Sequence, residues 1–176
     1  MNLASGAAPV SRYLKQGLRV GLASDLAGGS SLNLFQAMAH AVQASKLRWR
    51  LLDQQTPPLT FDQAFYLATL GGGRFFGSVG TFADGYQFDA LVLDDSRYPS
   101  VLPLTIEQRV ERLAYLSEPS CLVAKFISGK KSGLNPMQTA SCWSRRAFNR
   151  RLFAAVPLRL HSPDSGALVF SSNMLY

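Results

Sequence analysis

Apolar residues in the first half of the chain change their spacing in a way that predicts a strand followed by helices. The mostly apolar run over residues 19–23 is typical of a short buried strand, and small residues over 26–31 follow it as a turn. From residue 33 to about 47, apolar positions recur every three or four residues, which predicts an amphipathic helix. A shorter helical piece over 10–16 precedes this strand-turn-helix unit.

Two capping-box sequences predict the starts of two further helices. Thr60 is followed three residues later by Gln63, and Thr105 by Gln108. The first helix is expected to run to about residue 70, where three consecutive glycines break it, and the second to about residue 116. Short β-like pieces are expected from residue 79, followed by strands over 88–93 and 121–128 and a turn at 129–130.

Asp25 is the candidate functional residue, because it lies where the predicted strand gives way to the glycine-containing turn. Catalytic groups and ligands of α/β proteins gather at the carboxyl ends of strands. Two other interpretations stay open at this point. Asp25 could cap the following helix or form the turn, and Gly28 with Gly29 could form a phosphate-binding turn.

Composition narrows the class of protein. An apolar fraction of 47% over 176 residues is enough for a packed core, and Cys121 and Cys142 form neither a disulfide framework nor a metal-spacing motif. The sequence has no charged-then-apolar leader and no apolar run long enough to cross a bilayer, so we expect a cytoplasmic protein with no membrane contact.

The basic character of the chain lies mostly in its last quarter. Residues 1–132 hold 13 Lys/Arg and 10 Asp/Glu, a balance of +3, whereas residues 133–176 hold five Arg and one Asp, a balance of +4. Basic and aromatic residues alternate over 143–151, a pattern that can bind single-stranded nucleic acid. The tail shows no folded organisation, so a solvated or disordered tail is favoured over a nucleic-acid partner.

Three stretches resemble the carboxyl-terminal part of guanine deaminases of the amidohydrolase superfamily. They are Gly21-Leu-Ala-Ser-Asp-Leu-Ala-Gly-Gly-Ser30, His40-Ala-Val-Gln-Ala-Ser-Lys46 and Ala64-Phe-Tyr-Leu-Ala-Thr-Leu-Gly-Gly-Gly73. Weaker matches follow in order, at residues 80–85, 88–92, 109–116 and 126–130. The resemblance covers about residues 1–131, and the second and third stretches are its most specific parts.

The resemblance implies an α/β fold with a divided architecture. Residues 1–78 would hold the last β/α unit of a metal-dependent-hydrolase TIM barrel, residues 79–132 the return to a small carboxyl-terminal β domain, and residues 133–176 an unassigned, irregular tail. The implied activity is hydrolysis of guanine to xanthine and ammonia in purine catabolism. Members of the family commonly form homodimers.

The resemblance also implies a role for Asp25 as a zinc ligand and proton shuttle. In such a site the Zn²⁺ ion lowers the pKa of a bound water, and the Asp accepts its proton and delivers it to the departing amine. The other ligands of the family are a His-x-His pair and two single histidines, with an acid/base Glu. This chain has only His40 and His161, neither in such a context, and the guanine-contacting residues of the family lie upstream of the matched part.

Other functions stay open beside this one. Asp25 alone does not choose the substrate, so another aminohydrolase or chlorohydrolase of the superfamily is an alternative. A non-catalytic interaction module is another.

We predict that the isolated chain neither binds zinc tightly nor deaminates guanine at an enzymatic rate. One strand-helix unit cannot close a parallel barrel of about 250 residues, and its single strand would lack hydrogen-bonded neighbours. Zinc titration and xanthine detection with the purified chain test this. Stoichiometric zinc together with measurable xanthine would contradict it.

Overall fold

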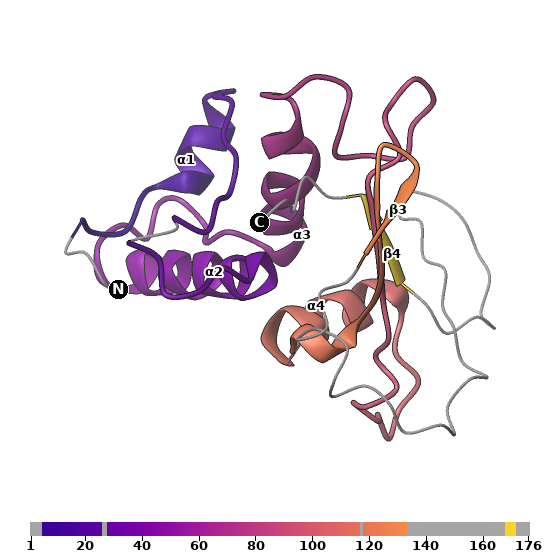
Figure 1. Ribbon diagram of the computed structural model, residues 1–176. Helices are drawn as coiled ribbons and strands as arrows, with labels where there is room; N and C mark the ends of the chain where they lie inside the picture. Colours follow the sequence, from indigo (N-terminus) through magenta and orange to yellow (C-terminus); the bar gives the residue numbers. More distant parts are fainter. Residues whose placement is uncertain (1–4, 26–27, 117, 134–167, 172–176) are drawn as a thin grey trace. The chain divides into compact units, whose positions relative to one another are not determined.

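The structure is a computed structural model, and it describes residues 5–25, 28–116, 118–133 and 168–171 (Figure 1). The chain divides into two compact units, the first extending to Gly77 and the second beginning at Ser78. Each unit is described by itself. Among the described residues, no helix is both long and apolar enough to cross a membrane.

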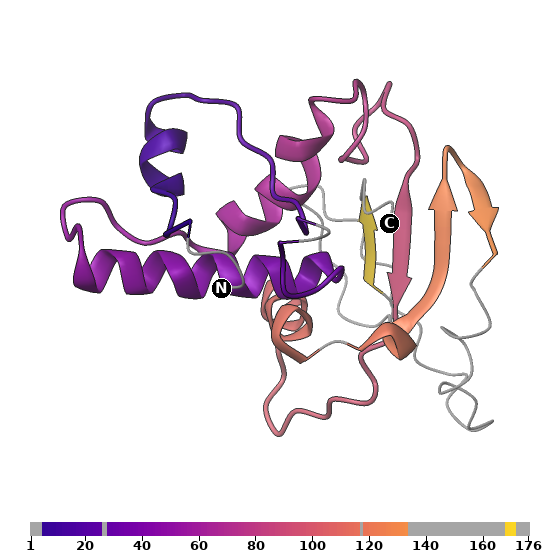
Figure 2. The ribbon, with the colours of Figure 1, turned by 60° about the vertical axis from the view of Figure 1, so that its left-hand side comes forward.

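Helices make up the regular structure of the first unit: α1 (Val10–Lys15), α2 (Leu34–Leu51) and α3 (Phe61–Tyr66), which continues as the π-helix η1 (Leu67–Gly71) (Figure 2). The apolar face of α2 packs against α3. The core residues of this unit are Phe35, Met38, Ala39, Val42, Leu59, Ala64, Leu67 and Ala68. The three- and four-residue spacing along α2 therefore identified its buried side.

Both predicted capping boxes form. Gln63 N donates to Thr60 Oγ1 at 3.2 Å while Thr60 N donates to Gln63 Oε1 at 3.1 Å. Thr105 and Gln108 make the same reciprocal pair at the start of α4 (Ile106–Leu116). Each box satisfies two backbone donors that the first turn of a helix leaves without a partner.

Three local expectations were wrong. Residues 19–23 form no strand, because the described part of the chain offers this segment no neighbouring strand to pair with. The Gly71–Gly73 run does not break its helix, which continues through Gly73. The residues from 79 to 87 contain turns and bends but no strand, since positive φ angles at Gly80 and Gly85 turn the chain there.

A four-stranded antiparallel sheet forms the second unit together with α4. Its strands are β1 (Ala90–Leu93), β2 (Leu122–Ile127), β3 (Lys130–Ser132) and β4 (Leu168–Ser171), in the order β3-β2-β1-β4. A short 3-10 helix, η2 (Pro119–Cys121), leads into β2. Strand β1 is central and fully buried, and it packs with Val110, Leu113 and Ala114 of α4 in one core. Part of the 133–176 tail thus joins the sheet as β4, whereas the basic segment 143–151 lies outside the described residues.

An ion-pair cluster lies directly after β1. Asp95 is 7% exposed in its side chain and accepts hydrogen bonds from Arg109 Nε at 2.8 Å and Arg112 Nη2 at 3.0 Å, with a further bond from Arg109 Nη2. Burial alone would raise the pKa of Asp95, but the hydrogen bonds and charges of the two arginines outweigh it and lower the pKa below its usual value. The cluster ties α4 to the chain that leaves the central strand.

Replacing Asp95 by Ala should lower the free energy of unfolding by about 3 kcal/mol, because two partly buried guanidinium groups lose their counter-charge. Urea unfolding of the variant against wild type measures this. Asp84→Ala, at an exposed position in the same unit, is the matched control and should change the value by less than about 0.5 kcal/mol. Equal stabilities for the Asp95 variant and wild type would contradict the assignment.

The same carboxylate gives the stability a pH dependence with a defined sign. Because its pKa in the folded protein is lowered, the stabilisation is fully present above about pH 5 and is lost as the pH falls through the folded pKa. In the Asp95→Asn variant, the free energy of unfolding should therefore lack the decrease that the Asp95 carboxylate causes below about pH 5.

Candidate active-site turn

Asp25 ends the extended segment and begins a tight turn. Its backbone carbonyl accepts hydrogen bonds from Gly28 N at 3.0 Å and Gly29 N at 2.5 Å. A Cβ at Gly29 would lie 1.8 Å from Ser24 O, so no other residue fits this turn as it stands. The Asp25 residue itself is exposed, which leaves its carboxylate accessible from outside the first unit's core.

Backbone strain distinguishes Asp25 from its neighbours. Its φ of 52° lies in the left-handed region, and among the described non-glycine residues only Ser128 shares that feature. Asp and Asn enter this region more readily than other side chains, but the conformation still costs free energy. Non-glycine residues in such conformations cluster at functional sites, where the surrounding structure holds them in place.

The geometry argues against a capping role and a phosphate-binding turn, and it agrees with the interpretation that Asp25 forms the turn. Asn33 caps α2, because its Oδ1 accepts a hydrogen bond from Phe35 N at 3.0 Å. Asp25 is therefore not the cap. The amides of Gly28 and Gly29 donate to Asp25 O within the turn, so they do not form the open row of donors that a phosphate-binding turn needs.

His40 links the far end of this turn to α2. Its Nδ1 lies 3.2 Å from Ser30 Oγ, and both residues are exposed. His40 is therefore a surface residue of α2. Ser30 was not predicted as its partner, because a ten-residue separation across a turn leaves no periodic signal in the sequence.

The described residues do not by themselves form a metal centre. Nowhere in the described ranges do three His, Cys, Asp or Glu side chains gather closely enough to hold a metal ion. His161 and Cys142 lie outside these ranges. Asp25 is thus a single carboxylate that could contribute one ligand and one proton acceptor to a larger site.

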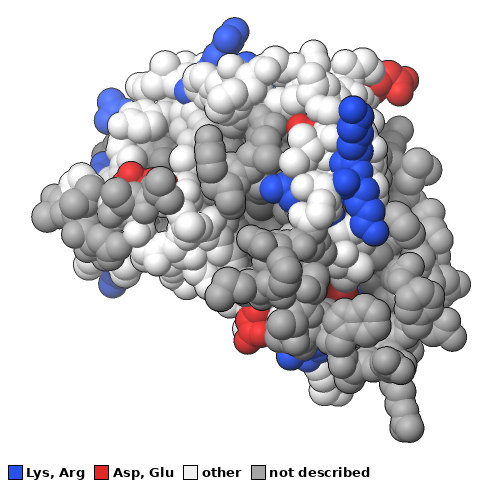
Figure 3. Space-filling view, in the orientation of Figure 1, with Lys and Arg blue, Asp and Glu red and all other residues white. Residues whose placement is uncertain are grey.

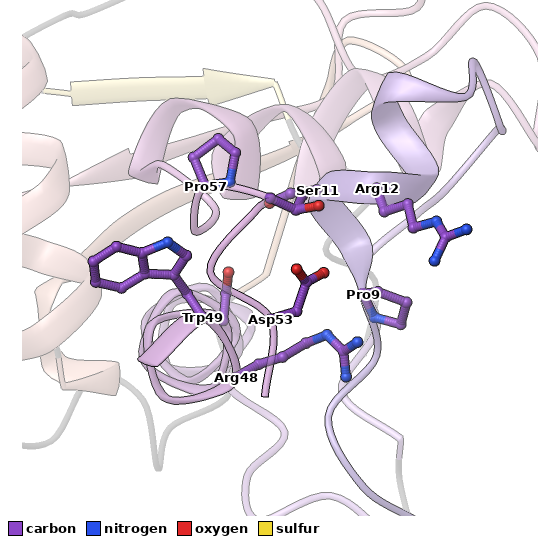
Figure 4. A pocket seen from close by; sticks show the side chains of 9 residues that line it. Pro9, Ser11, Arg12, Arg48, Trp49, Asp53 and Pro57 are labelled. Carbon is purple, nitrogen blue, oxygen red and sulfur yellow. The ribbon is translucent and has the colours of Figure 1, made fainter. Parts of the chain in front are cut away.

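Asp25 lines neither of two cavities in the described part of the first unit. The first has a volume of about 20 Å³ and is lined by Ser11 of α1, Arg48 and Trp49 of α2, and Asp53 just after α2 (Figure 4). This is room for about one water molecule. The second, of about 280 Å³, lies beside Leu14, Lys15 and Pro58. Neither cavity is therefore a candidate for the chemistry of Asp25.

Surface charge adds no second candidate site on the face seen in Figure 3. On the face seen in Figure 3, the described Lys and Arg side chains lie in separate groups among uncharged residues. A nucleic-acid interface needs a continuous basic surface. That face of the described chain does not provide one.

Comparison with known proteins shows which family and which enzymes this chain is similar to. The sequence model of the Amidohydrolase family matches residues 1–131. Guanine deaminase of Dictyostelium discoideum is 30% identical over 136 residues, which cover 73% of this chain and 30% of that protein. The 5-methylthioadenosine/S-adenosylhomocysteine deaminase 1 of Syntrophus aciditrophicus is 35% identical over 134 residues, covering 74% and 29%.

A solved structure shows the same similarity. The crystal structure of guanine deaminase from C. acetobutylicum, with guanine bound in its active site, aligns with a TM-score of 0.68 and 40% sequence identity. The alignment covers 73% of this chain and 30% of that one. The chain thus spans about a third of the length of the relatives it matches.

The strain at Asp25 leads to a stability prediction. Asp25→Gly should keep the free energy of unfolding unchanged or raise it by up to about 1 kcal/mol, because glycine adopts a positive φ without steric cost. Asp25→Val should lower it by about 1–2 kcal/mol, because a β-branched side chain is poorly tolerated there. Urea unfolding measures both.

The same substitution elsewhere supplies the control. Asp62 lies in the first turn of α3, where Asp62→Gly should destabilise the protein by up to about 1 kcal/mol. If Asp25→Gly were destabilising to the same extent, residue 25 would not be strained.

Proposed function

Because the chain belongs to the amidohydrolase family, we propose that it is the part of a guanine deaminase that contributes the aspartate of the hydrolytic site, and that this residue is Asp25. The observation that carries the proposal is the exposed carboxylate of Asp25, a residue with a strained backbone. It lies inside the region that the family model matches. The 40% identity to a guanine deaminase that binds guanine supports the choice of substrate.

The proposal includes an assignment of the two units. Residues 1–78 would correspond to the last β/α unit of a (β/α)₈ barrel, with the extended segment 19–23 as its strand and α2 as its helix. Residues 79–132 would belong to the small β domain. The order extended segment, turn and helix supports the first assignment, and the antiparallel pairing of β1 with β2 supports the second.

The chemistry proposed for Asp25 is proton transfer. In hydrolytic deamination of guanine, the oxygen of water bonds to C2 and the bond from C2 to the amino nitrogen breaks. Of the two protons of this water, one must reach the departing nitrogen, which leaves as ammonia, and the other ends on N3 of the xanthine ring. A carboxylate within hydrogen-bond reach of both atoms can accept the proton and then donate it. Asp25 has the required group, and its exposed position leaves that group accessible to a substrate.

Family membership also implies a metal cofactor, for which we propose Zn²⁺. Zinc supplies electrostatic stabilisation and activates water when it is bound. Asp25 would be the ligand that this part of the protein provides. The described residues supply no cluster of three ligands, so the remaining ligands have to come from elsewhere in the complete site.

A second candidate substrate class has its own support. The Syntrophus aciditrophicus relative, a 5-methylthioadenosine/S-adenosylhomocysteine deaminase, is 35% identical over 134 residues. Both named activities release an amino group from a purine ring. The role proposed for Asp25 is the same in both cases, and only the recognition of the purine differs.

A chimeric enzyme tests the role of Asp25. Residues 1–131 replace the matching segment of the C. acetobutylicum guanine deaminase, which supplies the rest of the protein. The chimera should form xanthine from guanine, and Asp25→Asn should lower kcat by about 10²–10⁴-fold, because the amide cannot accept the proton. Asp62→Asn, an exposed change in α3, is the matched control and should leave kcat within about threefold. An active Asp25→Asn chimera would refute the assignment.

A paired chimera with the Syntrophus aciditrophicus deaminase distinguishes the two substrate classes. Residues 1–131 should support more activity in the guanine deaminase than in the methylthioadenosine deaminase, each compared with its own parent. The reverse order would favour the second substrate class and leave the role of Asp25 intact.

A further inference from the structure

The segment that leads to Asp25 lies directly on the backbone of the π-helix η1. Leu22 N donates a hydrogen bond to Leu67 O at 3.0 Å, across 45 positions of sequence. One residue earlier, a Cβ built on Gly21 would lie 2.9 Å from the Cα of Gly72. At this crossing no side chain separates the two backbones.

Glycine is required on both sides of this crossing. Cβ atoms essentially never approach another backbone to 2.9 Å, so a side chain at Gly21 would push the segment away from the helix. A Cβ on Gly71 would lie 2.9 Å from Val20 O, so a side chain at residue 71 is excluded for the same reason. The close approach therefore depends on residues that lie far apart in the sequence.

The acceptor of the hydrogen bond lies at the start of the π-helix. Leu67 O also accepts the amide of Gly72, which closes the wider turn of this helix. The two donors at Leu67 O thus come from the helix itself and from the segment that leads to Asp25. Leu67 is 1% exposed, so its carbonyl has no access to water as an alternative partner.

We propose that Gly21 acts as a positioning residue for Asp25 through its backbone contact with Gly72. Their contact brings Leu22 N to Leu67 O and so fixes the chain three residues before the carboxylate. Downstream, the amides of Gly28 and Gly29 hold the carbonyl of Asp25. The residue is thereby restrained on both sides, and the upstream restraint depends on the glycine pair.

This inference rests on the proposed function for its catalytic consequence, because a misplacement of about 1 Å in a reacting group can cost about a hundredfold in rate. The claim that the Gly21–Gly72 contact fixes the chain before Asp25 does not rest on that function. The two are therefore tested with different measurements.

The geometric test uses the full chain and two glycine variants. In Gly21→Ala, amide hydrogen exchange at Leu22 should become at least about tenfold faster, and the side-chain ¹³C carboxylate signal and φ-sensitive coupling of Asp25 should shift. Gly72→Ala should show a smaller change of the same kind, since its Cβ would lie 3.1 Å from Leu67 O and 3.9 Å from Gly21 Cα. Exchange in α2 at Met38 and Val42 should stay within about threefold of wild type.

Gly133→Ala is the matched control, because a Cβ there meets nothing within 4 Å. It should leave the Leu22 and Asp25 signals unchanged. If Gly21→Ala accelerated exchange equally at Leu22, Met38 and Val42, the glycine pair would serve general stability and the inference would be wrong. Unchanged Leu22 exchange and Asp25 signals in Gly21→Ala would also overturn it.

The catalytic test introduces Gly21→Ala into the guanine deaminase chimera. We expect kcat to fall by at least about tenfold while KM stays within about threefold, since the substrate-contacting part of the chimera is untouched. An unchanged kcat in an active chimera would refute the positioning role. An inactive parent chimera would count against the proposed function, and the exchange measurements would still decide the geometric claim.

Discussion

The first unit depends on the backbone contact between Leu22 and Leu67. The extended segment at 19–23 has no strand beside it among the described residues, and this hydrogen bond connects it to a buried helix. Buried backbone groups that lack partners cost free energy, so the position of the bond limits the paths open to the segment. The turn at Asp25 begins three residues after this hydrogen bond, and Asn33 caps α2 beyond the turn.

The second unit depends on a different kind of constraint. Its central strand β1 is buried along its whole length, and the chain that leaves it carries Asp95. Two arginines on α4 approach this carboxylate from one side of the helix, three residues apart, which is the spacing of neighbours on a helical surface. Charge pairing thus fixes α4 where apolar packing with Val110 and Leu113 alone would allow rotation about its axis.

Features set by local rules could be predicted from the sequence, whereas features set by distant contacts could not. The capping boxes at Thr60 and Thr105 and the buried face of α2 follow from spacings within a few residues. The helix continues through Gly71–Gly73 against the local rule, and the close approach of Val20, about 51 positions away, explains why residue 71 is a glycine. Likewise, the pairing of β4 with β1 joins segments about 75 residues apart.

Two requirements, one from the observed backbone and one from the proposed reaction, favour the same residue type at position 25. The turn needs a left-handed φ at this position and a glycine four residues later, which favours a short polar side chain such as Asn or Asp. The chemistry proposed for the site needs an acceptor that can both take and return a proton, which excludes Asn. Of these two side chains, only aspartate satisfies both requirements. The backbone geometry and the proposed reaction together therefore favour aspartate at residue 25, although each leaves alternatives when taken alone.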